Sequence, residues 1–150
     1  MVRTSQKRGP TGKAPPEVLK LTRRMTTLFR ERLDEKLRPL GITSAQLKIL
    51  AVLTKEPGTS GAHISRACEV TPQTTHALLG VAEDRGWIER SPHPENLHTL
   101  LATLTPEGQR VFSRGYTIAL KLQGQMLRTL TAAEVQQLES VLMQLIENLG

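Results

Sequence analysis

The stretch from residue 60 to residue 105 constrains the fold most, because signals for helices, turns and strands follow one another there at short intervals. Ser60 can accept a hydrogen bond from the first turn of a helix, and Thr71 followed by Pro72 can open a second one. The two residues before Thr71 leave room only for a turn between the helices. The first helix is expected to bury three residues at spacings of three and four, namely Ile64, Ala67 and Cys68.

The second helix carries an apolar stripe that also follows helical spacing, and Gly86 is placed to end it in a left-handed conformation. Residues 87–90 and 97–104 then predict two strands, with the turn-forming residues 91–96 between them. A helix, a turn, a second helix and a hairpin in this order are typical of a winged helix-turn-helix. The inner stripe of the second helix is expected to consist of Thr75, Leu78, Leu79 and Ala82.

Helical patterns flank this unit on both sides. Thr43 and Thr131 each start a capping box, in which a Gln or Glu follows three residues later. Apolar residues recur at steps of three and four over residues 16–40 and 106–149. We therefore predict a mainly α fold with a small β-wing, in which a winged helix-turn-helix at about residues 43–105 is flanked by helices from both chain ends.

Four segments of the chain, GITSAQLKIL, VTPQTT, DRGWIERSPHPEN and LATLTPEG, occur in this order. They resemble the MarR-type winged-helix transcriptional regulators, the multiple-antibiotic-resistance regulators, and the resemblance runs from residue 17 to residue 148. It implies a single domain over residues 16–150, with the terminal helices at 16–40 and 106–149 used for dimerisation. It also implies a homodimeric repressor that binds a palindromic operator in double-stranded DNA and responds to a small lipophilic or phenolic effector.

Length and composition fit one globular domain, since 38% of the 150 residues are hydrophobic and 23% are charged. No apolar run approaches the roughly 20 residues of a membrane span, and a single cysteine excludes an internal disulfide framework. We therefore expect a cytoplasmic protein with no membrane contact. Residues 1–15 are basic and rich in Gly, Pro, Ser and Thr. They predict a disordered tail that is either an arm for DNA phosphates or simply solvated.

We expect DNA contacts from two groups of side chains, at the opening of the second helix and at the tip of the hairpin. Gln can pair with adenine, and Thr can contact a base or the thymine methyl group. The chain departs from the family at two places, because Ala77 stands where Arg is frequent and Asn96-Leu97-His98 replace an Asp-Arg-Arg-like run. A winged-helix dimer that acts through protein interactions is therefore the alternative. The expected contacts are Thr71, Gln73, Thr74, His76, Ala77, His93, Asn96 and His98.

The resemblance also implies an effector site in a crevice between the terminal helices and the winged helix. An apolar site with a few polar groups suits a lipophilic or phenolic acid. Arg24 or Arg30 could pair with its carboxylate. Plain core packing is the other interpretation of each apolar candidate. Those candidates are Met25, Phe29, Phe112 and Tyr116.

Other chemistry finds little support in the sequence. Cys68 could be a redox sensor, but its place in an apolar stripe favours a core residue. The four histidines match no common zinc spacing, so no metal is expected. No phosphate-binding glycine loop, HExxH or GxSxG motif is present, so neither an enzyme nor a cofactor is expected.

Overall fold

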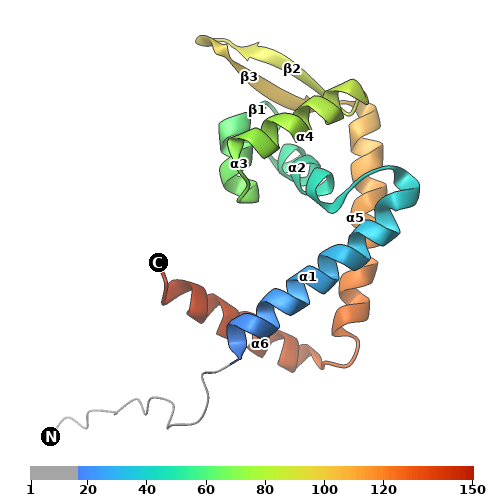
Figure 1. Cartoon of the computed structure of the whole chain (residues 1–150), viewed down its shortest axis with the longest axis vertical. Helices are drawn as coiled ribbons and strands as arrows, with labels where there is room; N and C mark the ends of the chain where they lie inside the picture. The colour runs from blue at the N-terminus through green and yellow to red at the C-terminus, as the bar shows by residue number, and fades with distance from the viewer. Residues whose placement is uncertain (1–16) are drawn as a thin grey trace, which may run out of the picture.

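A computed structural model describes residues 17–150 and confirms a mainly helical chain with a small antiparallel sheet (Figure 1). The predicted basic tail at residues 1–15 lies outside the described residues. The elements, in chain order, are helix α1 (Val18–Leu37), the short 3-10 helix η1 (Arg38–Leu40), α2 (Ser44–Lys55), β1 (Thr59–Ser60), α3 (Gly61–Cys68), α4 (Pro72–Asp84), β2 (Ile88–His93), β3 (Asn96–Leu104), α5 (Pro106–Leu127) and α6 (Ala132–Glu147).

The winged helix occupies one end of the molecule, and the helices from the chain ends occupy the other (Figure 1). Helices α2, α3 and α4 lie beside a three-stranded sheet of order β1-β3-β2. Helix α5 leaves the end of β3 and runs away from the sheet, packing against α1 and α2 on its way (Figure 1). Helix α6 follows at the far end, and none of its residues is buried. The arrangement is that of a winged helix-turn-helix joined by α5 to a second helical region.

Side-chain caps define where the helices begin. The Thr43 hydroxyl accepts the Gln46 amide at 3.2 Å, and the Gln46 side chain accepts the Thr43 amide at 2.9 Å, as the predicted capping box requires. The Asp34 carboxylate of α1 accepts the Ser44 amide at 2.6 Å. A carboxylate is favourable at the positive end of a helix dipole, so this contact fixes α2 against the end of α1.

The core lies where α2, α3, α4 and the sheet meet α1 and α5. Leu37 and Leu50 are fully buried there. Burial of one such leucine contributes about 2 kcal/mol. Inside this core the Ser65 hydroxyl donates to the Thr75 hydroxyl at 2.8 Å, which joins α3 to α4 and leaves neither oxygen unsatisfied. The other buried apolar residues include Leu33, Ile42, Leu47, Ile49, Leu53, Ile64, Cys68, Leu79, Ala82, Trp87, Ile88, Ala102 and Leu122.

Two local predictions are wrong. Ala67 was expected on the inner face of α3, but it is exposed and Ser65 is buried instead, because the Thr75 hydroxyl accepts its proton. The hairpin turn was expected over 91–96, but β2 continues to His93. Pro92 is tolerated inside β2 because this is an edge strand, where a missing amide donor disrupts little pairing.

No helix within residues 17–150 combines the length and the apolar character needed to cross a membrane.

Candidate nucleic-acid interface

The opening of α4 is fixed by Thr71. Its hydroxyl accepts the Thr74 amide at 3.1 Å and donates to the Thr74 hydroxyl at 2.9 Å. Because the Thr71 hydroxyl already donates one hydrogen bond and accepts another within the chain, Thr71 caps the helix and has no free proton to donate to a base. The Thr74 hydroxyl keeps its own proton, which can be donated to an acceptor outside the chain.

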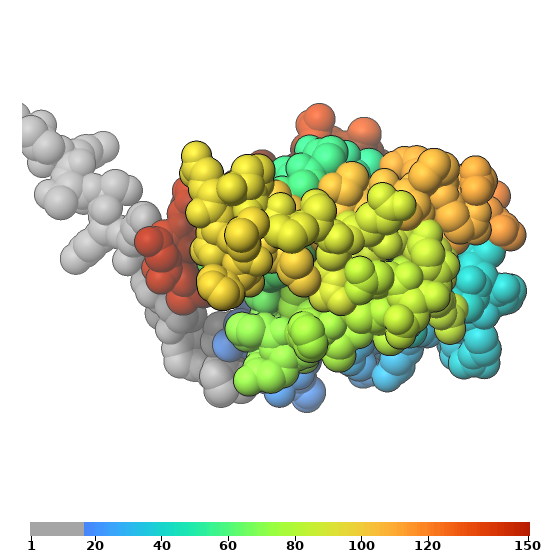
Figure 2. All heavy atoms as spheres, turned by 90° about the horizontal axis from the view of Figure 1, so that it is seen from above, coloured from blue at the N-terminus to red at the C-terminus, as the bar shows by residue number. Residues whose placement is uncertain are grey.

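The face of α4 opposite the core is open. Thr75, Leu79 and Ala82 are buried against the rest of the winged helix. With 3.6 residues per turn, the side chains on the opposite side then point outward. Seen from above, α4 and the hairpin share this face of the molecule (Figure 2). The predicted contact residues of the helix that are exposed on it are Thr71, Gln73, Thr74, His76 and Ala77.

The hairpin tip is shaped by side chains that were predicted to touch DNA. His93 Nδ1 accepts the Glu95 amide at 3.0 Å, and Asn96 Oδ1 accepts the His98 amide at 3.2 Å. These bonds use one acceptor of His93 and one of Asn96, which leaves the His93 Nε2 and the Asn96 amide nitrogen as donors. Leu97 is 75% exposed at the same tip. The wing therefore offers two polar donors and an apolar side chain.

Two arginines near this face are engaged within the fold. Arg85 donates to the Gly41 carbonyl at 2.5 Å and lies 5.1 Å from the centre of the Trp87 ring system. Arg90 Nε donates to Glu83 at 2.9 Å, and this hydrogen bond lowers the pKa of the Glu83 carboxyl. Both contacts hold the end of α4, one to the turn before α2 and the other to β2.

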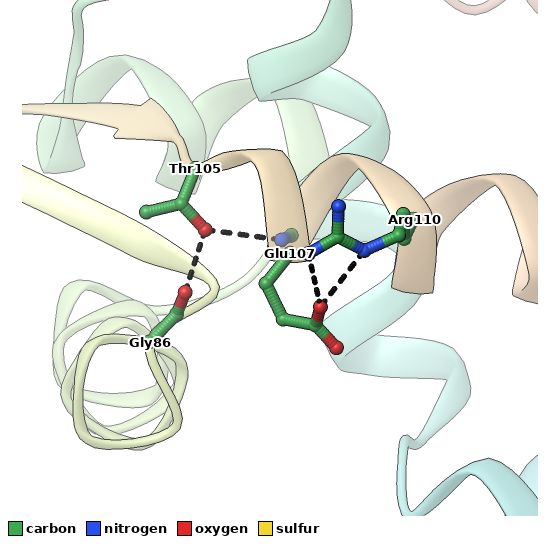
Figure 3. Close-up of polar contacts among 5 residues, drawn as sticks. Gly86, Thr105, Glu107 and Arg110 are labelled. Carbon is green, nitrogen blue, oxygen red and sulfur yellow. Dashed lines mark hydrogen bonds and ion pairs between the residues drawn. The ribbon is translucent and has the colours of Figure 1, made fainter.

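Thr105 joins the end of α4 to the start of α5 (Figure 3). Its hydroxyl donates to the Gly86 carbonyl at 2.6 Å and accepts the Gly108 amide at 3.0 Å. Gly86 has φ +70°, so it is the left-handed residue predicted to end the helix. In the same turn of α5 the Glu107 carboxylate pairs with Arg110 at 2.7 Å. Thr105 therefore fixes both the turn that follows α4 and the first turn of α5.

The chain is similar in sequence to known regulators of transcription. The MarR family model matches residues 40–96. The HTH-type transcriptional repressor Rv2887 of Mycobacterium tuberculosis is 30% identical over 119 residues, which cover 79% of this chain and 86% of the repressor. The chain belongs to the MarR family. The multiple antibiotic resistance protein MarR of Escherichia coli is 29% identical over 111 residues, covering 73% of this chain and 77% of that protein.

A solved structure also shares the fold. It is that of a mutant E. coli MarR complexed with operator DNA, which is 26% identical to this chain with a TM-score of 0.79. The match covers 85% of this chain and 92% of the solved one. The fold of this chain therefore agrees with that of E. coli MarR along most of its length.

A cavity of about 690 Å³ lies between α1, α2 and α5, and Cys68 at the end of α3 and Leu78 in the middle of α4 also line it. The rings of Phe112 and Tyr116 stack in its wall with centroids 5.4 Å apart. Arg30 and Lys48 supply positive charge, and no carboxylate among residues 17–150 lines the cavity. Of the predicted ligand residues, Met25, Phe29, Phe112 and Tyr116 do gather here.

Arg24 does not line this cavity, so its prediction as the carboxylate partner is not supported there. It lines a neighbouring hollow of about 710 Å³ between α1 and α5. Lys48 was missed, and it lies in the first cavity with its Nζ donating to the Cys68 carbonyl at 2.9 Å. The cavity is lined on the α2 side by three residues at three-residue steps, Ala45, Lys48 and Ala51. This spacing places Lys48 between two small residues on one face of the helix, and it was the sequence signal that could have identified Lys48 as a cavity residue.

Cys68 lines the cavity and is buried. Burial raises the pKa of its thiol, and the nearby Lys48 offsets only part of this rise. A protonated thiol is a poor nucleophile, so the geometry favours the core interpretation over the redox interpretation. Among the histidines, the Nε2 atom of His63 lies 2.8 Å from a carboxylate oxygen of Glu56. Among residues 17–150, no three His, Cys, Asp or Glu side chains lie close enough together to hold a metal ion.

Proposed function

We propose that this MarR-family chain forms a homodimer that binds a palindromic DNA operator and represses transcription in the cytoplasm. The observation that carries this proposal is the open face of α4, on which Gln73, Thr74 and His76 are exposed. Helix α4 and the hairpin lie side by side on this side of the molecule (Figure 2). Side chains of these types can hydrogen-bond base edges in the major groove. The related E. coli MarR structure with operator DNA supports the same use of the fold.

The unburied apolar surface of α6 supports the dimer. Leu138, Val141 and Ile146 are exposed on α6, and Leu21 and Leu28 are exposed on α1. An exposed apolar surface of this extent marks an interaction site in a soluble domain. A second copy related by a two-fold axis can cover it, and the two α4 helices would then match half-sites about 34 Å apart. We keep the prediction that residues 16–150 act as one domain.

The cavity supports a response to a small effector. Its aromatic wall and its two cations, Arg30 and Lys48, suit a lipophilic or phenolic acid. It is lined by α1 and α5, two of the helices proposed to dimerise, and by Leu78 of α4. A ligand that binds one spacing of the α4 helices better than another shifts the population toward that spacing. Release from the operator follows when the favoured spacing no longer matches the half-sites.

Fluorescence anisotropy across a salt series tests the DNA proposal, with the palindrome upstream of the gene and a scrambled duplex as probes. We expect the chain to prefer the palindrome and Gln73→Ala to lose about 1–3 kcal/mol on it alone. Gln136→Ala is the matched control, because Gln136 is an exposed glutamine of α6 at the other end of the molecule (Figure 1). Equal affinity for both duplexes at every salt concentration would contradict sequence-specific binding.

A dimer that acts through protein interactions is the second candidate. Residues 60–105 carry three arginines against five acidic residues, and two of the arginines are engaged within the fold. Such a surface attracts phosphate weakly, since non-specific DNA binding depends on Lys and Arg. Absence of binding to either duplex even at low salt would favour this candidate over the regulator.

A further inference from the structure

The exposed face of α4 carries no formal charge until its last turn. Gln73, His76, Ala77 and Gly80 recur on this face at steps of three and four, and Val81 beside them is 39% exposed. The first charged residues of the helix are Glu83 and Asp84 at its end. Over about two turns, the surface that faces a DNA groove is therefore uncharged.

This face lacks the usual reader of guanine. Guanine presents two acceptors in the major groove, and the commonest specific contact is a pair of donors from Arg or Lys. Arg85 and Arg90 lie after the last residue of α4, and each already donates within the fold, to the Gly41 carbonyl and to Glu83 respectively. His76 in its neutral form has a single N–H and offers one donor instead of two. The remaining arginine of the winged helix, Arg66, lies on α3.

The same face is suited to A·T pairs. The Gln73 amide has both a donor and an acceptor, which match the adenine N7 and N6 groups. The Ala77 methyl group and the Val81 side chain can contact the thymine methyl group. A Cβ at Gly80 would meet nothing within 4 Å, so packing within the chain does not require glycine there. Its small size lets a DNA strand approach the centre of the helix closely.

We propose that the major-groove core of each operator half-site is read as A·T pairs, through adenine at Gln73 and thymine methyl groups at Ala77 and Val81. Guanine is not read by α4. This inference rests on the proposed function, because it specifies which DNA the same face recognises.

Selection of binding sites from a randomised duplex library by the full chain tests the inference. The selected half-sites should carry A·T pairs at the positions facing α4. Uracil in place of thymine there removes only the methyl group and should weaken binding about fourfold per methyl contact, as burial of one such group predicts. Replacing every guanine of the site with 7-deazaguanine should leave affinity unchanged. Loss of tenfold or more with 7-deazaguanine, or no loss with uracil, would overturn the inference while leaving the regulator intact. Enrichment of no sequence at all would overturn both.

Ala77→Arg gives a second test that depends on the same face. The new side chain brings two donors to an exposed position, so selection by this variant should enrich a guanine at one position and lose the uracil effect there. Ala62→Arg adds the same charge at an exposed position of α3 and is the control. It should raise affinity for all duplexes alike and leave base preference unchanged. If Ala77→Arg behaves like Ala62→Arg, α4 does not read bases at this point and the inference fails.

Discussion

The Thr105 hydroxyl donates to the Gly86 carbonyl at 2.6 Å, so one side chain connects the turn after α4 to the first turn of α5 (Figure 3). The Thr105 amide also donates to the Trp87 carbonyl at 3.0 Å. Helix α5 contributes Phe112 and Tyr116 to the cavity, about two and three turns further on. Helix α5 therefore lines the cavity along its length and is bonded at its start to the turn after α4.

Replacing Thr105 by Val removes both the helix cap and the bond to Gly86 while keeping the branched shape. We expect a loss of about 1–2 kcal/mol in the free energy of unfolding, as for other lost helix caps. Urea unfolding followed by circular dichroism measures it. Thr105→Ser keeps the hydroxyl and is the control, so equal stabilities of the Val and Ser variants would show that the hydrogen bonds contribute nothing.

Gly108 is required by a close approach of two backbones. A Cβ at this position would lie 1.9 Å from the Trp87 carbonyl oxygen. Gly108→Ala must therefore push α5 away from the start of β2, and we expect a loss of about 2 kcal/mol or more. Gly80→Ala is the control, because its Cβ meets open space and should stabilise the helix by about 0.5–1 kcal/mol. Thermal unfolding of both variants without DNA decides the matter, and equal effects would contradict the steric argument.

The features that act within a few residues of sequence were predictable. The caps at Thr43, Thr71 and Thr131 each accept an amide three residues later, so a local pattern is enough to find them. The buried stripe of α4 follows from helical spacing for the same reason. The opening of the recognition helix was therefore placed correctly from the sequence.

The features that join distant segments were not predictable. Strand β1 has two residues and exists only because Thr59 and Ser60 pair with Ala102 and Leu101 of β3. The contact of Arg85 with the Gly41 carbonyl spans 44 residues of sequence. Neither leaves a periodic signal, because each depends on how the elements pack.

The Cys68 thiol should react slowly in the folded protein. It is buried, and burial raises its pKa, so little thiolate is present at neutral pH. Alkylation by iodoacetamide, followed by mass spectrometry, should be slow in buffer and fast in urea. Peroxide should leave operator binding unchanged both in the wild type and in Cys68→Ser. Release of DNA by peroxide in the wild type that is lost in Cys68→Ser would instead establish a redox switch.

The contact between Glu83 and Arg90 should stabilise the fold in a pH-dependent way. The hydrogen bond from Arg90 lowers the pKa of Glu83 below its ordinary value of 4.5. The unfolded chain, with the higher pKa, binds a proton first as the pH falls. The stabilisation is therefore complete above the ordinary value and is lost as the pH falls through the lower folded-state pKa.

A double-mutant cycle over pH isolates this effect. Urea unfolding of the wild type, Glu83→Gln, Arg90→Gln and the double variant gives the coupling between the two side chains. We expect a favourable coupling at about pH 7, where Glu83 is ionised, and its disappearance at about pH 2, where the carboxyl is protonated. The bond holds the end of α4 to β2, so its loss at low pH should also loosen the hairpin. A coupling of the same size at both pH values would show that ionisation of Glu83 is not what stabilises this junction.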